Sequence, residues 1–185
     1  MTIQLLAVIL LCLHPDVVHP YFLDITDDIV RNLELRCVLM VLDDPDSLGN
    51  IRRDVFRKLK VQSKVVFKSD IEQMQNLGSM DKCGVFVKIE KEEMVFKYLE
   101  NILELNSFDQ NIFKNLHWYI FLTREDNLKM VFRYDSNVYI IIKDKVVDGV
   151  SKLVETYSIE EGVNVNKMVG KWSSGNGLGK REKSS

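Results

Sequence analysis

Along the middle of the chain, short and mostly apolar runs are separated by longer segments in which apolar residues recur at helical spacing. Four short runs are mostly apolar, with many β-branched or aromatic side chains, as is typical of strands buried on both faces; they are residues 36–42, 64–67, 84–89 and 118–122. Between these runs, apolar residues recur at helical spacing, which predicts helices over residues 48–59, 70–77, 92–105 and 112–116. Strand and helix therefore alternate four times between residues 36 and 122.

This alternation predicts an α/β fold with a mainly parallel sheet flanked by helices, since parallel strands are joined by helical crossovers that cover both faces. One more short helix is expected from Thr123 to Phe132. The pattern then changes. Two runs rich in β-branched and aromatic residues, 137–142 and 151–159, are joined by polar residues and glycine, and they predict a β-hairpin at the end of the domain.

The start of the chain carries the first information about location. Residues Ile3 to Leu13 are apolar except for Gln4, which matches the length of a signal-peptide core and is too short to span a bilayer. We expect a signal peptide over residues 1–19; a buried amino-terminal strand is the alternative. The mature chain would be secreted or extracellular, with no membrane-spanning segment. Its α/β domain is expected over residues 20–172 and a disordered tail over residues 173–185.

Two cysteines, Cys37 and Cys83, remain after removal of such a signal peptide. In an oxidising compartment they could form a disulfide, which requires Cα atoms within roughly 7 Å of each other. The alternative is two small buried hydrophobic residues at the starts of strands. The sequence leaves both open.

Charge and spacing argue against several classes of function. Lys and Arg number 25 and Asp and Glu number 27, so nothing suggests a nucleic-acid-binding surface. His117 follows a short helix and is expected to be structural, and no His or Cys cluster has metal-ligand spacing. Residues 44–49 resemble a calcium loop with Leu48 at an oxygen-ligand position, and residues 175–180 resemble a phosphate loop that no helix follows.

We therefore expect no enzyme, no cofactor and no catalytic or metal-binding residue. A nucleotide-binding fold stays open on architecture alone, and fold does not settle function. Glu155 as a catalytic acid would need a second titratable partner, which the spacing does not provide.

The last third of the chain carries a series of short motifs. The residues that define them, in chain order, are Trp118, then Asp135, Ser136 and Asn137, then Glu155 and Tyr157, and finally Gly170 and Trp172. The Asp-Ser-Asn triplet is a turn former that delivers the chain into a strand. Tyr157 is expected to pack with its hydroxyl bonded, and Trp172 to anchor the end of the domain by burying its ring.

The order and spacing of these motifs resemble those in the amino-terminal extracellular region of insect ionotropic receptors. These receptors are chemosensory ligand-gated cation channels of the divergent ionotropic glutamate receptor family. The resemblance covers about residues 118–178. It implies half of a periplasmic-binding-protein-like amino-terminal domain, which stands before ligand-binding lobes and a pore that the given residues lack. No ligand-contacting residue can be carried over, and the motif residues are read as structural.

The sequence is compatible with two functions of different classes. One is a receptor ectodomain that contacts other receptor subunits. The other is a secreted α/β module that binds an unknown small ligand at the carboxyl ends of the strands. An apolar cavity near residues 42–46 and 89–92 would favour the small-ligand module, whereas a flat exposed apolar face would favour subunit contact.

Overall fold

The computed structural model describes residues 20–43, 51–74, 82–89, 91–107, 109–123, 130–144, 146–147, 149–160 and 163–180. The expected signal peptide lies outside these residues. The helices are α2 (Pro20–Asn32), α3 (Ile51–Lys58), the 3-10 helix η2 (Lys68–Met74), α4 (Glu92–Leu105) and α5 (Ile112–Asn115). The strands are β1 (Cys37–Leu42), β2 (Gln62–Phe67), β3 (Cys83–Lys88), β4 (His117–Leu122), β5 (Val138–Lys143), β6 (Val150–Glu160), β7 (Val163–Ser173) and β8 (Gly177–Lys180).

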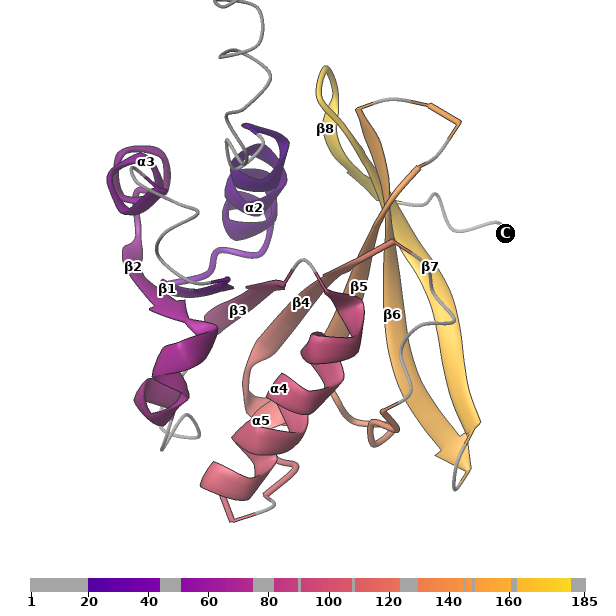
Figure 1. Ribbon diagram of the computed structural model, residues 1–185. Coiled ribbons are helices and arrows are strands. Elements are labelled where there is room, and N and C mark those ends of the chain that lie inside the picture. The colour runs from indigo at the N-terminus through magenta and orange to yellow at the C-terminus, as the bar shows by residue number, and fades with distance from the viewer. Residues whose placement is uncertain are drawn as a thin grey trace, which may run out of the picture.

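The eight strands of the described residues form one sheet in the order β2-β1-β3-β4-β5-β6-β7-β8 (Figure 1). Strands β2, β1, β3, β4 and β5 run parallel, whereas β5, β6, β7 and β8 are antiparallel neighbours. The prediction of a mainly parallel sheet flanked by helices, as in half of a periplasmic-binding-protein-like domain, is therefore wrong. The sheet is mixed, and its carboxyl-terminal half is an antiparallel meander that continues past the single expected hairpin.

Short connections explain the antiparallel half. Residues 144–149 join β5 to β6, residues 161–162 join β6 to β7, and residues 174–176 join β7 to β8. A crossover to a parallel strand needs a dozen or more residues, so each of these connections can only reverse the chain. In the first of them, the Asp144 carboxylate accepts hydrogen bonds from the backbone N–H groups of Val146 (2.8 Å) and Val147 (3.2 Å).

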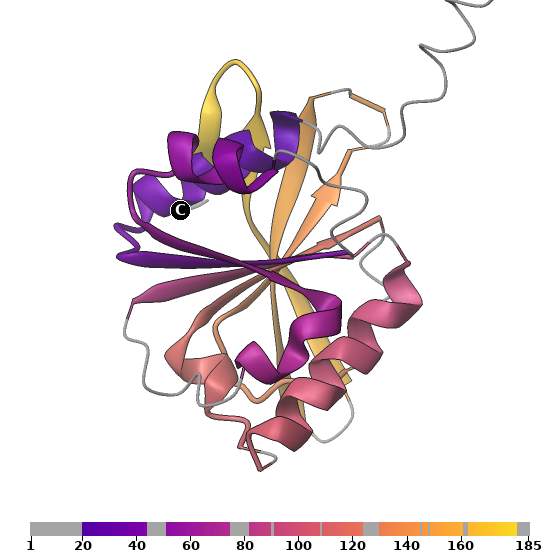
Figure 2. The ribbon, with the colours of Figure 1, turned by 60° about the vertical axis from the view of Figure 1, so that its left-hand side comes forward.

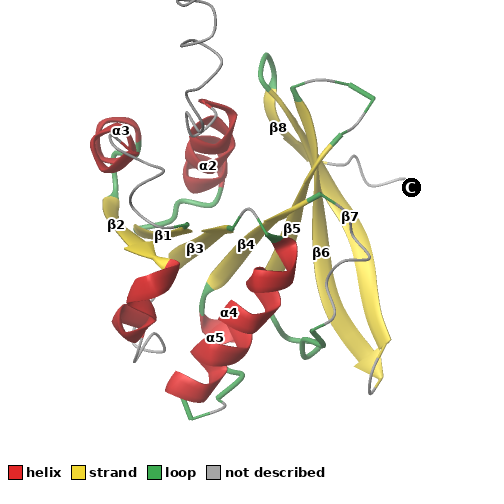
Figure 3. Ribbon diagram, in the orientation of Figure 1, coloured by secondary structure: helices red, strands yellow, loops and turns green. Residues whose placement is uncertain are grey.

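Helices cover both faces of the parallel half, and each face has its own core (Figure 2). On one face, α2 and α3 pack Phe22, Ile25 and Val55 against strand residues such as Met40. On the opposite face, η2, α4 and α5 pack over a second buried cluster that includes Leu99. The long strands β6 and β7 extend beyond the helices (Figure 3).

Three elements have no counterpart among those expected from the sequence: α2, β7 and β8. Helix α2 buries Phe22, Ile25 and Ile29, which recur at helical spacing. In place of a tail from Ser173, the chain turns sharply and pairs β8 with β7. The turn depends on Gly177, whose φ of +66° suits glycine, and whose missing side chain leaves room for the Asp28 carboxylate.

The expected helix from Thr123 to Phe132 falls partly outside the described residues, and its described end, from Met130 to Phe132, is not helical. Phe132 is nevertheless buried, and its carbonyl accepts a hydrogen bond from the Ser158 backbone N–H (2.7 Å). Across the described part of the chain, no helix combines the length and apolar character that crossing a bilayer requires.

Candidate functional site

A pocket lies where the order of the parallel strands changes direction. From β1 the chain crosses through α3 to β2 on one side, while β3 lies on the other side of β1 and connects onward through α4. In open α/β sheets, ligands bind beyond the carboxyl ends of the strands at such a switch point. Lys68 and Ser69 directly follow the end of β2, Ile89 directly follows β3, and all three line the pocket.

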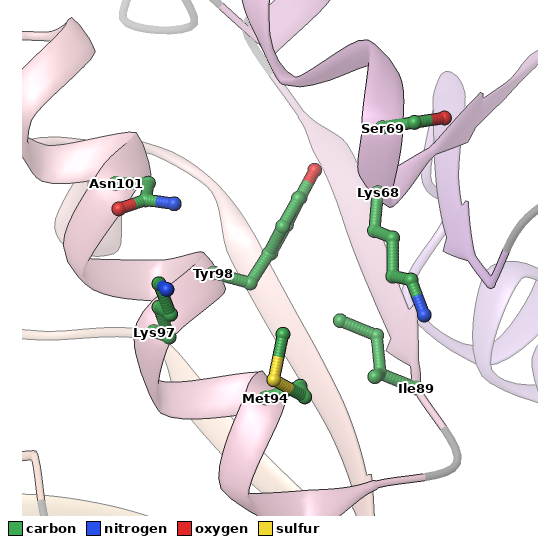
Figure 4. Close-up of a pocket in the computed structure, with 7 residues that line it drawn as sticks. All are labelled: Lys68, Ser69, Ile89, Met94, Lys97, Tyr98 and Asn101. Atoms are coloured by element: carbon green, nitrogen blue, oxygen red, sulfur yellow. The ribbon is translucent and has the colours of Figure 1, made fainter.

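Helix α4 forms the opposite wall of this pocket (Figure 4). Met94, Lys97, Tyr98 and Asn101 line it, and their spacing places them on one face of the helix. The cavity has a volume of about 180 Å³. Figure 4 shows the Tyr98 ring standing between α4 and η2, with its hydroxyl directed toward η2.

The polar groups of the pocket differ in how they are paired. Lys68 forms an ion pair with Asp43, the residue after β1. Lys97 is exposed and has no ion pair among the described residues. The Tyr98 hydroxyl is buried and has no hydrogen-bond partner in the part of the chain that the structure describes. Burial raises the pKa of Tyr98, so this hydroxyl stays protonated and is available as a donor.

The sequence indicated a crevice near residues 42–46 and 89–92. Ile89 does line the pocket, whereas residues 44–46 and 90 lie outside the described residues. The contribution of α4 was missed, although the i, i+3, i+4, i+7 spacing of its lining residues could have indicated it.

Four of the motif residues gather around the short helix α5. The Trp118 indole N–H donates to the Ile112 carbonyl (2.9 Å), and the ring packs against Phe113 with centroids 5.0 Å apart. The Asn137 backbone N–H donates to the Phe113 carbonyl (2.6 Å), and its side-chain amide donates to the Lys114 carbonyl.

The other two residues of the triplet complete this network. The Asp135 carboxylate pairs with Lys114 (3.0 Å) and Arg133 (3.2 Å), and these partners lower the pKa of Asp135, the hydrogen bond from Lys114 most of all. Ser136 is buried, and its backbone N–H donates to the Arg133 carbonyl (3.1 Å). The triplet therefore fixes the entry into β5 against α5.

The last two motif residues tie the end of the chain to its beginning. The Trp172 indole N–H donates to the Asp28 carboxylate at 2.6 Å, and its ring meets Tyr21 edge-on, 5.0 Å between centroids. Only 2% of Trp172 is exposed. Gly170 lets β7 approach β8 closely, since a Cβ there would lie 3.1 Å from the Gly179 carbonyl oxygen.

Glu155 faces a row of aromatic rings that runs across the sheet. Phe86, Tyr119 and Tyr139 are register neighbours and stack at centroid distances of 4.7 and 5.3 Å. Glu155 pairs in register with Tyr139 on one side and Lys167 on the other. Burial, and then the charge of Glu155, raise the pKa of Tyr139. Tyr157, two residues further along β6, is half-buried opposite Val165.

Cys37 and Cys83 are the first residues of β1 and β3 and are direct register partners. The structure joins them in a disulfide, with Cα atoms 4.6 Å apart. His117 starts β4, and burial lowers its pKa. No group of three or more His, Cys, Asp or Glu side chains within the described ranges is placed to hold a metal ion.

No protein family matches the chain, and no curated protein is similar to it. The case for a function therefore depends on the residues themselves.

Proposed function

We propose that this chain is the amino-terminal ectodomain of an ionotropic receptor, with an extracellular location. The observation that carries the proposal is that the motif residues make contacts between different helices and strands of the domain. Trp118, Asp135 and Asn137 form one network around α5, and Trp172 packs on α2. Each lies at a junction between elements, as expected of residues that define a domain.

The disulfide supports the extracellular location. Disulfides persist in oxidising compartments and are rare in the cytosol of most organisms. The Cys37–Cys83 bond closes a segment of 46 residues between neighbouring strands, so it constrains the first half of the sheet.

Contact with a neighbouring subunit is assigned to the outer edge of β7. Residues 163–168 pair with β6 on one side and, among the described residues, have no strand on the other, because β8 pairs only with residues 170–173. Val163 at the start of β7 and Ile159 near the end of β6 are 58% and 70% exposed, so two large apolar side chains lie beside the start of this edge. Main-chain groups on a free edge can pair with another strand.

A second copy of the chain fits this edge by symmetry. Antiparallel pairing about a two-fold axis at Asn166 would set each Lys167 opposite Val165 of the other copy, so the two lysines would not face each other. Lys167 is the one charged residue in the sequence 163–169.

The genomic sequence that follows the codon for Ser185 tests the receptor proposal. We expect it to encode two ligand-binding lobes and three membrane helices in the same reading frame or in an adjacent paralogue. Expression of the epitope-tagged chain in insect cells tests the location. Secretion with loss of the first residues is expected, and cytosolic retention with an intact amino terminus would refute it.

The pocket between η2 and α4 favours a second candidate function, that of a small-ligand-binding module. It combines a switch-point position, an apolar wall and a buried hydroxyl with no described partner. This candidate is compatible with the first, because a receptor ectodomain can also bind a small molecule. Binding of small organic molecules to the purified chain, followed by nuclear magnetic resonance, tests it.

A further inference from the structure

The apolar part of the pocket sets the size of what it can hold. Ile89, Met94 and the Tyr98 ring line a cavity of about 180 Å³. An apolar cavity of about 150 Å³ accepts a benzene molecule. A ligand with an apolar body of roughly this size would therefore fill the space between α4 and the end of β3.

The polar part of the pocket is rich in hydrogen-bond donors. The ammonium of Lys97, the amide of Asn101, and the hydroxyls of Ser69 and Tyr98 belong to its lining residues. Figure 4 shows Asn101 on α4 with its amide nitrogen on the side nearer to Tyr98. Because burial keeps the Tyr98 hydroxyl protonated, it can donate to an acceptor throughout the physiological pH range.

No acidic side chain lines the pocket within the described part of the chain. Asp43 is paired with Lys68. Glu93 and Glu100 on α4 and Asp70 on η2 do not line the pocket. Lys97 lines the pocket and forms no ion pair with a described acid, so its ammonium can meet an anion there.

From this combination we infer that the pocket binds a small organic anion, a carboxylate on an apolar body about as large as a benzene ring. The carboxylate accepts hydrogen bonds from Lys97 and the neutral donors, while the ring packs on Ile89 and Met94. This inference deepens the second candidate function and rests on the pocket being a ligand site.

Three probes of one size separate the preference for an anion from ligand binding in general: benzoate, benzyl alcohol and benzylamine. Each is titrated into the 15N-labelled full chain, and the backbone amide shifts of Ser69, Ile89, Lys97 and Asn101 are followed. We expect benzoate to shift these amides with a millimolar or tighter dissociation constant. Benzyl alcohol should bind about tenfold more weakly, since a charge-assisted hydrogen bond is lost, and benzylamine should not bind.

Two variants test the donors. Lys97→Gln keeps most of the side-chain stem and should raise the benzoate dissociation constant about fivefold, a modest change because Lys97 is exposed and screened. Tyr98→Phe should raise it about threefold. Lys60→Gln removes an exposed lysine beyond α3 and should leave binding unchanged.

The outcomes are distinguishable. If none of the probes shifts the pocket amides, the small-ligand function fails and the anion preference fails with it. Equal binding of all three probes would keep the ligand site and overturn its preference for an anion. Unchanged benzoate affinity in Lys97→Gln would also overturn it.

Discussion

At the scale of single residues, Trp172 shows how one polar atom on a buried ring can join distant parts of a chain. Its indole N–H reaches Asp28, which lies 144 residues earlier. The burial of Trp172 could be predicted from its ring alone. Its partner could not, because Asp28 is one of several acidic residues in a segment with no predicted helix.

Replacing Trp172 with Phe tests this link. The variant keeps an aromatic ring and loses the hydrogen bond to a carboxylate, so the free energy of unfolding should fall by about 2 kcal/mol. Urea denaturation followed by circular dichroism measures the change. Asp28→Asn, which keeps an acceptor, should cost less, and equal stability of all three proteins would show that the bond contributes nothing.

His117 gives stability a dependence on pH. Burial lowers its pKa in the folded chain below the value of about 6.5 in the unfolded chain. The unfolded chain then binds more protons as pH falls below that value, so stability decreases toward acid pH. His117→Gln should flatten this dependence in urea denaturation at pH 7.5 and pH 5.5. If His117→Gln lost as much stability between pH 7.5 and pH 5.5 as the parent does, His117 would not be the source of the pH dependence.

At the scale of elements, helix α4 was predicted with its bounds because its apolar residues repeat over 14 positions. Strand β7 was missed for the opposite reason. It combines asparagine, lysine and glycine with valine, and much of it is exposed, so its alternation is weak. The parallel pairing of β1 to β4 followed from their long connections, whereas the reversal after β5 follows from short ones.

The network around α5 is expected to control whether this short helix opens locally. Asn137→Asp keeps the shape of the side chain but removes the amide donor to the Lys114 carbonyl. Hydrogen exchange of the Leu116 amide, which donates to the Ile112 carbonyl, should become about fivefold faster. Asn166→Asp on exposed β7 is the matched control. Faster exchange in both variants, or in neither, would argue against a local role.

The disulfide stabilises the pairing of β1 with β3. Replacing Cys37 and Cys83 together with alanine should lower the free energy of unfolding by about 2 to 4 kcal/mol, because the unfolded chain gains conformational freedom over the 46-residue segment. Chemical denaturation of the parent with and without a reductant gives an independent measure. In the oxidised parent, neither Cys37 nor Cys83 should react as a free thiol.

At the scale of the whole molecule, the two halves of the sheet differ in how they are covered. The parallel half has helices on both faces, and the antiparallel half ends in an open edge on β7. The position of the pocket follows from the first half and could be foreseen in outline, because ligands of open α/β sheets bind at the carboxyl ends of the strands. The open edge could not, since it depends on which residues β8 leaves unpaired.

Self-association through this edge is expected to be weak, because a single strand contact buries little surface. Analytical ultracentrifugation at high protein concentration should detect a dimer. Changing Ile159 and Val163 together to Lys should abolish it, whereas Val146→Lys, at the other end of β6 where the side chain is 91% exposed, should not. A dimer that survives the double change would place the interface elsewhere.

The contact between α2 and β8 brings together the first helix and the last strand that the structure describes (Figure 1). A load applied to residues after β8 would pass to β7 through the strand pairing and to α2 through the contacts that Gly177 and Trp172 make with Asp28. Any polypeptide that follows β8 is thereby mechanically coupled to helix α2.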